Sequence, residues 1–224
     1  MKKGLKRLLS KEQLAARAAR EVGDGMCVNL GFGIPSLVAE YLAGRDVLLH
    51  TENGIIGMGP MAKKSGGDPD IINATKQPVT IVPGGAIVSQ SDSFMIIRGG
   101  HLDMTFLGAF QVSEKGDLAN WKVPGEDTIP GMGGAMDLAV GAKRIIVTMT
   151  HTDKDGAPKI LKECTFPLTG RRCVSLIVTD LAVIRITPEG LVIEETAPGF
   201  TAAEIQQATG AKLKISPSLK EIAV

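Results

Sequence analysis

The sequence predicts an α/β protein with a mainly parallel sheet and an antiparallel part toward its C-terminus. Between residues 26 and 150, short apolar segments typical of strands alternate with segments typical of helices, which favours a parallel sheet. Two of the strand segments, 104–110 and 144–150, are apolar almost throughout, as expected for strands covered on both faces. Further along, consecutive apolar segments with only short polar breaks indicate antiparallel neighbours; they span residues 175–180, 181–187 and 191–196.

The first predicted element is an amphipathic surface helix. Ser10 and Gln13 have the spacing of a capping box, which starts a helix. Lys11, Arg17 and Glu21 then occupy one side of this helix, and the opposite side is apolar. The apolar positions are Leu14, Ala15, Ala18, Ala19 and Val22.

The elements that follow are assigned from periodicity and composition. A loop-rich stretch connects the second strand to residues 79–85. A last helix starts at a second capping box, Thr201 to Glu204, runs through Gln207 and stops at Gly210. The remaining assignments are strands at 26–32, 46–52, 104–110 and 144–150, and helices at 36–43, 92–98 and 135–143.

Composition predicts one domain, residues 1–224. A chain of 224 residues with 44% hydrophobic content can bury one large core but is short for two. Lys and Arg total 25 against 24 for Asp and Glu, which argues against a nucleic-acid partner. No signal-peptide pattern and no apolar segment of ~20 residues is present, so we expect no membrane association. Three cysteines without C-x-x-C spacing predict reduced thiols and a cytoplasmic protein.

Glycine is enriched, with 27 residues, and gathers in clusters after apolar segments. In an open α/β sheet such loops line the ligand crevice, and glycine lets the backbone approach a ligand closely. Composition alone leaves two interpretations open, a shared site or simply many turns. Pro35 and Ser36 replace the third glycine of a dinucleotide fingerprint, and no phosphate loop or nucleophile elbow occurs. The clusters span 31–35, 52–60, 83–85, 98–101 and 130–134.

The cluster at 130–134 continues directly into an apolar helical segment that is interrupted mainly by Asp137. Unpaired backbone N–H groups at the start of a buried helix can stabilise developing negative charge. This pattern is consistent with an oxyanion site. On the pattern alone, tight helix packing that requires small residues explains it somewhat better.

Glu52 ends an apolar strand segment and precedes Asn53 and Gly54. Asn-Gly is a strong hairpin signal, and a glutamate ahead of it would normally be solvated. The segment after the turn shows no alternation that would pair back, so the hairpin interpretation is incomplete. A functional carboxylate is the alternative.

Other sources of chemistry have weak support. His50 with Glu52, or His151 with Asp153, has the spacing of a metal pair, but the sequence has only three histidines, and we expect no metal. Each histidine is better explained as a structural hydrogen-bonding group. No histidine is placed beside a cysteine, which argues against a cysteine nucleophile.

Several motifs, in order along the chain, together resemble the beta subunit of the 3-oxoacid (succinyl-CoA:3-ketoacid type) coenzyme A transferase family. The similarity runs from about residue 10 to about residue 215. It implies a three-layer α/β/α CoA-transferase fold, which is also found in some sugar-phosphate isomerases (NagB/RpiA-like). The motifs are NLGFGIP, TENGIIGMGP, SFMIIRGGHLDMTFLGAFQV, GDLANW, PGMGGAMDLAVGAK and TFPLTG.

The resemblance also implies roles for individual residues. Glu52, in the ENG motif, matches the family's catalytic nucleophile, which carries CoA as a glutamyl thioester. Gly133 matches the backbone group expected at the reacting carbonyl. The residues expected near the substrate are Asn29, Asn53, Gly54, Gly131 and Gly134.

The reaction implied is ping-pong transfer of CoA from an acyl-CoA donor, succinyl-CoA or acetyl-CoA, to a 3-oxo acid such as acetoacetate, as in ketone body metabolism. The alternatives are the same chemistry on 3-oxoadipate or another short acid, a non-catalytic subunit, or a sugar-phosphate isomerase-like protein. The family works with an alpha subunit, which implies an α2β2 heterotetramer here. Coenzyme A is a substrate, and no cofactor or metal is expected.

Overall fold

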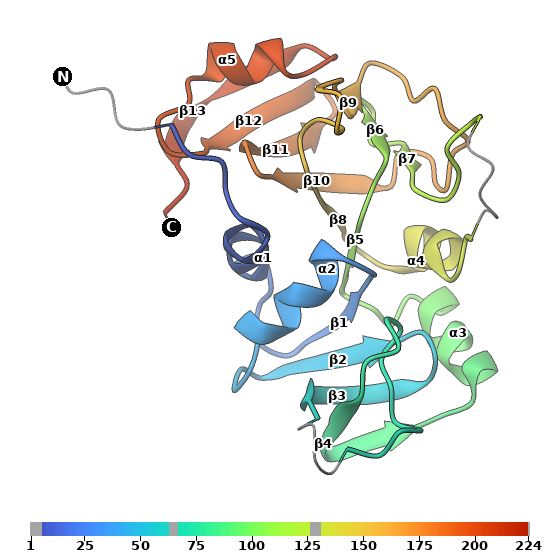
Figure 1. Ribbon diagram of the computed structural model, residues 1–224. Helices are drawn as coiled ribbons and strands as arrows, with labels where there is room; N and C mark the ends of the chain where they lie inside the picture. The colour runs from blue at the N-terminus through green and yellow to red at the C-terminus, as the bar shows by residue number, and fades with distance from the viewer. Residues whose placement is uncertain (1–5, 63–66, 126–130, 224) are drawn as a thin grey trace.

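The computed structural model describes residues 6–62, 67–125 and 131–223 (Figure 1). Its helices are α1 (Lys11–Ala19), α2 (Ile34–Leu37), the 3-10 helix η1 (Val38–Tyr41), α3 (Gln90–Arg98), α4 (Ala135–Gly141) and α5 (Ala202–Gln207). The strands of the main sheet are β1 (Met26–Leu30), β2 (Val47–Thr51), β3 (Ile55–Met61), β4 (Val79–Ile87), β5 (Met104–Leu107), β8 (Ile145–Met149), β10 (Val174–Thr179), β11 (Ala182–Thr187), β12 (Gly190–Thr196) and β13 (Leu213–Glu221).

Within the described residues these strands form one ten-stranded sheet, in the order β13-β12-β11-β10-β8-β5-β1-β2-β3-β4. Its centre is parallel, from β2 through β1, β5 and β8 to β10. Beyond β10, the strands β11 and β12 are antiparallel, as predicted, and β13 then runs parallel to β12. Both the mainly parallel sheet and its antiparallel C-terminal part are therefore confirmed.

A second antiparallel edge was not predicted. The stretch after β2 was expected to be rich in loops, but β3 pairs back on β2, and β4 pairs on β3. The hairpin interpretation of Asn53-Gly54 is therefore correct. The alternation of apolar and polar side chains expected of a strand is interrupted in β3 by Gly57, Gly59 and Pro60. The pairing register between β3 and β4 also shifts twice along this stretch.

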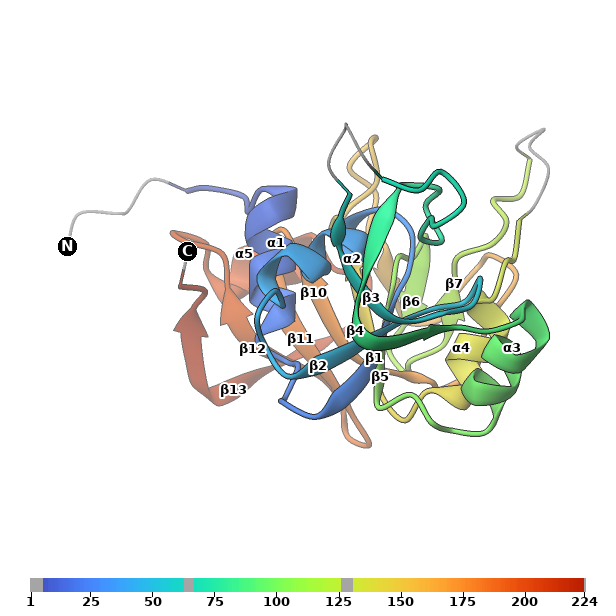
Figure 2. The ribbon, with the colours of Figure 1, turned by 90° about the horizontal axis from the view of Figure 1, so that it is seen from below.

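Helices cover both faces of the main sheet, which gives the three layers. The apolar cluster under α1 and η1 includes Leu14 and Val38. A second cluster lies under α3, α4 and α5 and includes Ile97, Leu138 and Ile205. Figure 2 shows α1 beside α2, and α3 beside α4 at another part of the sheet. A small sheet, which was not predicted, consists of β6 (Gln111–Ser113), β7 (Leu118–Ala119) and β9 (Ile160–Leu161).

Both predicted capping boxes are present. The Ser10 hydroxyl accepts from the Gln13 N–H at 3.2 Å, and the Thr201 hydroxyl accepts from the Glu204 N–H at 3.3 Å. These contacts satisfy N–H groups that have no partner within the helix. Among the described residues, no helix is both long and apolar enough to cross a membrane.

A buried ion network ties α1 to the sheet. The Arg17 guanidinium donates to Glu195 of β12 at 2.7 Å and to Glu21 at 2.9 Å, and Arg144 also donates to Glu21, at 2.6 Å. Arg17 and Glu195 are only 6% and 7% exposed. Each charge depends on its partners, because an unpaired charge in this environment would be poorly solvated.

We predict that Arg17→Ala lowers the free energy of unfolding by about 3 kcal/mol, because it leaves Glu195 and Glu21 without their shared cation. Lys143→Ala is the matched control: it removes an ion pair with Asp103 in which the lysine side chain is 62% exposed, and should cost less than ~1 kcal/mol. Urea denaturation measures both. Equal losses for the two variants would contradict the assigned role of the network.

Candidate active site

Glu52 begins the turn between β2 and β3. The Gly54 N–H donates to the Thr51 carbonyl at 3.0 Å and closes this turn. Gly54 has a φ of +113°, and a side chain there would collide with the carbonyl of Val88. The Val88 N–H in turn donates to the Gly54 carbonyl at 2.9 Å. The turn is thus held against the end of β4, and the position of Glu52 is fixed by backbone contacts.

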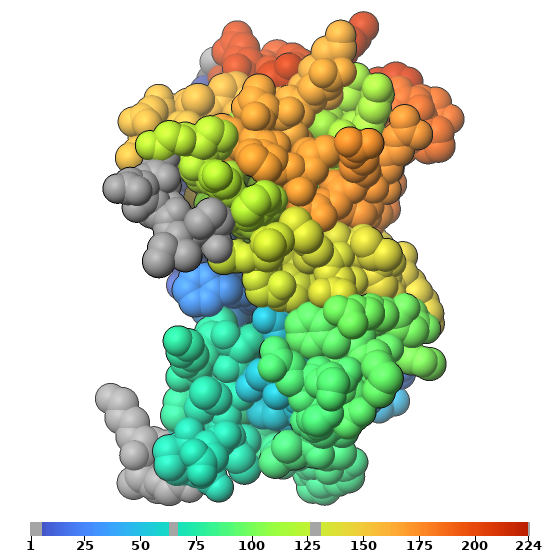
Figure 3. All heavy atoms as spheres, turned by 90° about the vertical axis from the view of Figure 1, so that its right-hand side faces the viewer, coloured from blue at the N-terminus to red at the C-terminus, as the bar shows by residue number. Residues whose placement is uncertain are grey.

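A second loop, distant in sequence, meets the Glu52 carboxylate. Gly134 caps the start of α4, and a Cβ at this position would overlap Oε2 of Glu52. Gly133 has a φ of +50°, and a Cβ there would lie 3.4 Å from Oε1. Figure 3 shows the face on which α4 (yellow) packs beside α3 (green). Because both positions are glycine, bare backbone approaches both carboxylate oxygens.

The surroundings of Glu52 act on the pKa of its carboxyl in both directions. Burial raises the pKa of its carboxyl above the ordinary value of 4.5, and the negative charge of Asp137 adds to this rise. The backbone N–H of Gly134 opposes it by favouring the charged form. Asp137 is itself paired with Arg98 at 2.6 Å. The result is a partly desolvated carboxylate whose charge is stabilised by a peptide amide.

Glu52 faces a cavity of about 660 Å³ at the carboxyl ends of the parallel strands. This is the usual position of a ligand site in an open α/β sheet. Its walls come from the β1–α2 loop (31–35), the end of β5 (107–110), the start of α4 (131–135) and the end of β8 (148–150). Large apolar side chains are exposed at its edge: Phe32 (80%), Met132 (45%) and Phe110 (41%).

The structure brings four of the predicted site residues together at this cavity: Glu52, Gly131, Gly133 and Gly134. Gly54 lies in the turn behind Glu52. The Asn53 side chain is exposed, and its amide donates to the Ile72 carbonyl at 2.8 Å, which anchors the turn to a neighbouring loop.

Asn29 is not among the residues that line the cavity. It is 2% exposed on β1, and its amide nitrogen lies 3.2 Å from both the carbonyl and Nδ1 of His50. His50 Nε2 lies 2.9 Å from the hydroxyl of Ser93 on α3, and burial lowers the pKa of His50 to about 4. This neutral network supports the end of β2. Through its contacts with His50, Asn29 helps to position strand β2, which leads directly to Glu52.

Sequence reasoning missed several residues of the site. Phe94 of α3 packs against the entry to α4, because its ring would lie 3.2 Å from a Cβ at Gly134. Thr148 and Lys159 line the far wall of the cavity. Phe94 lies within the motif SFMIIRGGHLDMTFLGAFQV, which assigned it no role, and none of the motifs covers Thr148 or Lys159.

Within the described ranges 6–62, 67–125 and 131–223, the side chains do not form a metal site or an activated cysteine nucleophile. No group of three or more His, Cys, Asp or Glu side chains in these ranges is arranged to hold a metal ion. His151 lies 2.9 Å from the hydroxyls of both Thr179 and Thr209, so it is a structural hydrogen-bonding group. Burial raises the pKa of all three cysteine thiols to about 11, which disfavours the nucleophilic thiolate.

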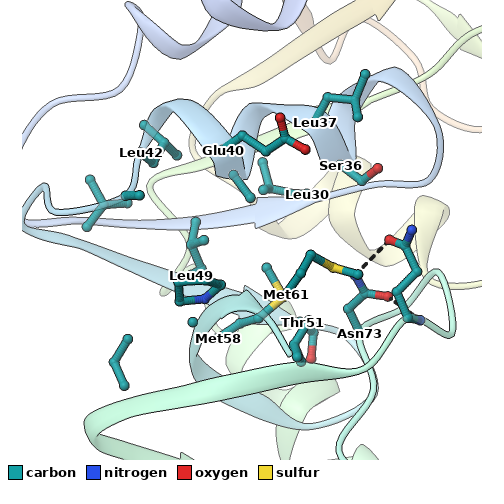
Figure 4. Close-up of a pocket in the computed structure, with 18 of the residues that line it drawn as sticks. Leu30, Ser36, Leu37, Glu40, Leu42, Leu49, Thr51, Met58, Met61 and Asn73 are labelled. Atoms are coloured by element: carbon teal, nitrogen blue, oxygen red, sulfur yellow. Dashed lines mark hydrogen bonds between the residues drawn. The ribbon is translucent and has the colours of Figure 1, made fainter. Parts of the chain in front are cut away.

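A second cavity, of about 540 Å³, lies among α2, η1, β2 and β3 (Figure 4). Apolar side chains such as Leu37, Leu49 and Met58 make up much of its wall. Arg45, also at its edge, donates to the carbonyls of Ala19 and Val22 and is therefore engaged in holding α1. Glu40, an exposed carboxylate, also lines this cavity, whereas Glu52 is partly buried against the backbone of Gly133 and Gly134.

Comparison with known proteins agrees with this site. Residues 11–208 match the Coenzyme A transferase family. The chain is 52% identical to a 3-oxoadipate CoA-transferase subunit of Pseudomonas putida over 92% of this chain and 96% of that protein. It is 51% identical to the mouse mitochondrial succinyl-CoA:3-ketoacid coenzyme A transferase 2B, over 94% of this chain but 41% of that protein.

The fold is shared with a solved structure, the apoenzyme of an acyl-CoA transferase (YdiF) from Escherichia coli O157:H7. The TM-score is 0.75 at 25% identity, over 96% of this chain and 43% of that chain. The chain therefore spans less than half the length of the mouse and Escherichia coli proteins, and nearly the whole length of the Pseudomonas putida protein.

We predict that Glu52→Gln raises the melting temperature at pH 8 by about 2 °C, the shift that ~1 kcal/mol or less produces in a chain of this size. The raised pKa means that ionised Glu52 destabilises the folded state above that pKa, and glutamine removes this charge. The gain should vanish below pH 4.5, where both side chains are neutral. Calorimetry measures it, with exposed Glu40→Gln as control. A gain that does not change with pH would contradict the electrostatic explanation.

Proposed function

Because the chain belongs to the coenzyme A transferase family, we propose that it is the beta subunit of an enzyme that moves CoA from an acyl-CoA donor to a 3-oxo acid, with Glu52 as the covalent carrier. The observation that carries this proposal is the position of the Glu52 carboxylate, partly buried against the backbone of Gly133 and Gly134 at the edge of a large cavity. Acetoacetate and 3-oxoadipate are both suitable acceptors for this chemistry.

Each step exchanges one carboxyl derivative for another. A Glu52 oxygen attacks the donor thioester carbon, and the C–S bond breaks to give a mixed anhydride and the CoA thiolate. The thiolate then attacks the Glu52 carbonyl carbon and releases the donor acid as its carboxylate. The acceptor carboxylate reverses these two steps on the glutamyl thioester. No redox change occurs and no proton is transferred, so the steps themselves require no cofactor beyond CoA as substrate.

The site geometry supports these steps in two ways. Each attack develops negative charge on a carbonyl oxygen, and one aimed N–H donor typically lowers such a barrier by ~3 kcal/mol. The backbone amide of Gly134 stabilises the charge of the Glu52 carboxylate, and the backbone at Gly133 also approaches it closely. Burial also removes water from around the nucleophile, which raises its pKa and protects an anhydride from hydrolysis.

We further propose that an alpha subunit covers the cavity, in an α2β2 assembly. Phe32 and Met132 at the cavity edge are exposed to 80% and 45% in this chain alone. Such apolar exposure beside a site that must exclude water is consistent with a protein surface that packs there. The longer mouse and Escherichia coli relatives carry additional sequence that this chain does not span.

The test is co-expression of Glu52 variants with the alpha subunit. Glu52→Ala should assemble normally but lose CoA transfer by several orders of magnitude. Glu52→Asp should lose about 100-fold or more, because one methylene displaces the nucleophile by about 1 Å. Glu40→Ala, at an exposed glutamate that lines the second cavity and not the one that Glu52 faces, is the matched control and should keep its activity. Normal turnover by the Glu52→Ala complex would refute the proposal.

A further inference from the structure

The hydroxyl of Thr148 lies beside the active-site cavity without a partner. Thr148 is on the central strand β8 and is 1% exposed. Among the described residues, its Oγ1 is the buried side-chain oxygen or nitrogen that makes no hydrogen bond. A buried polar group without a partner is costly, and valine would fill the same space without that cost. The Oγ1 atom is itself buried, so a ligand in the cavity can supply the missing partner only when the hydroxyl rotates toward the cavity that Thr148 lines.

Lys159 places a cation at the same end of the cavity. Its Nζ lies 3.5 Å from the hydroxyl of Thr150, and Thr150 stands two positions after Thr148. Alternation along an extended chain puts these two threonines on one side. The structure shows no ion pair for Lys159 with a described carboxylate; Asp153 and Asp180 are its acidic neighbours. Burial lowers the pKa of Lys159, and an anionic ligand would reverse this effect.

The distance between this polar end and Glu52 follows from the sheet. Register through β1, β5 and β8 places Glu52 almost level with Thr148. In the order β2-β1-β5-β8, three strand spacings of ~4.8 Å separate their backbones by about 14 Å. Between them the cavity is lined by Leu107, Gly108 and Ala109 at the end of β5, and by Gly31 and Phe32 after β1. This lining is apolar, so it suits a methylene chain better than a string of polar groups.

A dicarboxylic 3-oxo acid suits this arrangement, because it carries a second carboxylate for the cation in addition to the one that reacts at Glu52. A short acid without a distal carboxylate, such as acetoacetate, leaves the polar end empty. From the unpartnered hydroxyl, the cation and the apolar lining, we propose that Thr148 and Lys159 bind the distal carboxylate of a dicarboxylic 3-oxo acid and so select the acceptor. This inference rests on the proposed function.

The test compares two acceptors, 3-oxoadipate and 3-oxohexanoate. They share six carbons and the same reacting end and differ in the distal carboxylate. In ping-pong transfer, kcat/KM for the acceptor reports the half-reaction that follows loading of Glu52, so one fixed donor serves for both acids. The complex with the alpha subunit is used throughout.

The wild-type complex should prefer 3-oxoadipate by about tenfold or more, the effect expected of a charge-assisted hydrogen bond. Lys159→Gln and Thr148→Val should each remove most of that preference, and Lys162→Gln, at an exposed lysine, should retain it. Thr148→Val should be at least as stable as the wild type, because it removes an unpartnered hydroxyl. Thr148→Ser should be less stable than the wild type, because it loses a buried methyl group, but it should keep the preference for 3-oxoadipate, because it keeps the hydroxyl. If Thr148 acted only by stabilising the fold, the preference would instead follow the stability of the variants.

Three results would overturn the assignment. The first is a wild-type complex with no preference, and the second is variants that lose transfer to both acids equally. The third is an unchanged preference with a lower kcat/KM for the acyl-CoA donor, which would show that the anion bound here is a phosphate of CoA. Failure of the wild type to transfer CoA to any acid would instead refute the proposed function, and with it this assignment.

Discussion

The site depends on one contact, the approach of the backbone at Gly133 and Gly134 to the Glu52 carboxylate. It joins two segments that are far apart in sequence, the β2–β3 turn and the entry to α4. Any side chain at position 134 would overlap the carboxylate, so glycine is required there for steric reasons. Gly54, packed against the Val88 carbonyl, meets the same requirement on the other side. Glycines in these two loops therefore fix where the carboxylate lies.

This arrangement keeps Glu52 in a state that is unfavourable for folding and useful for chemistry. Burial and the nearby Asp137 raise its pKa, whereas one amide stabilises its charge. A poorly solvated carboxylate attacks a thioester more readily than a solvated one. The cost of holding that charge is offset by the surrounding packing, including the neutral His50 network under β2.

Much of this could be predicted from the sequence where local rules apply. Capping boxes at Ser10 and Thr201 located two helices, and apolar strands such as 144–150 revealed the parallel centre. The strand β3 was missed because Gly57, Gly59 and Pro60 break its alternation, although Asn53-Gly54 marked its turn. Glu52 was predicted from its motif, and the structure places it at the cavity. Thr148 could not be found, because a hydroxyl without a partner is a property of tertiary packing, and the sequence there indicates only a buried strand.

The covalent role of Glu52 is the central claim, and the mass of the intact chain tests it most directly. The assembled enzyme, incubated with an acyl-CoA donor and no acceptor, should show this chain heavier by one CoA less one water. The added mass should disappear when a 3-oxo acid is added, and should be absent in the Glu52→Ala complex. A chain that keeps its original mass while the assembled enzyme continues to turn over would contradict the account.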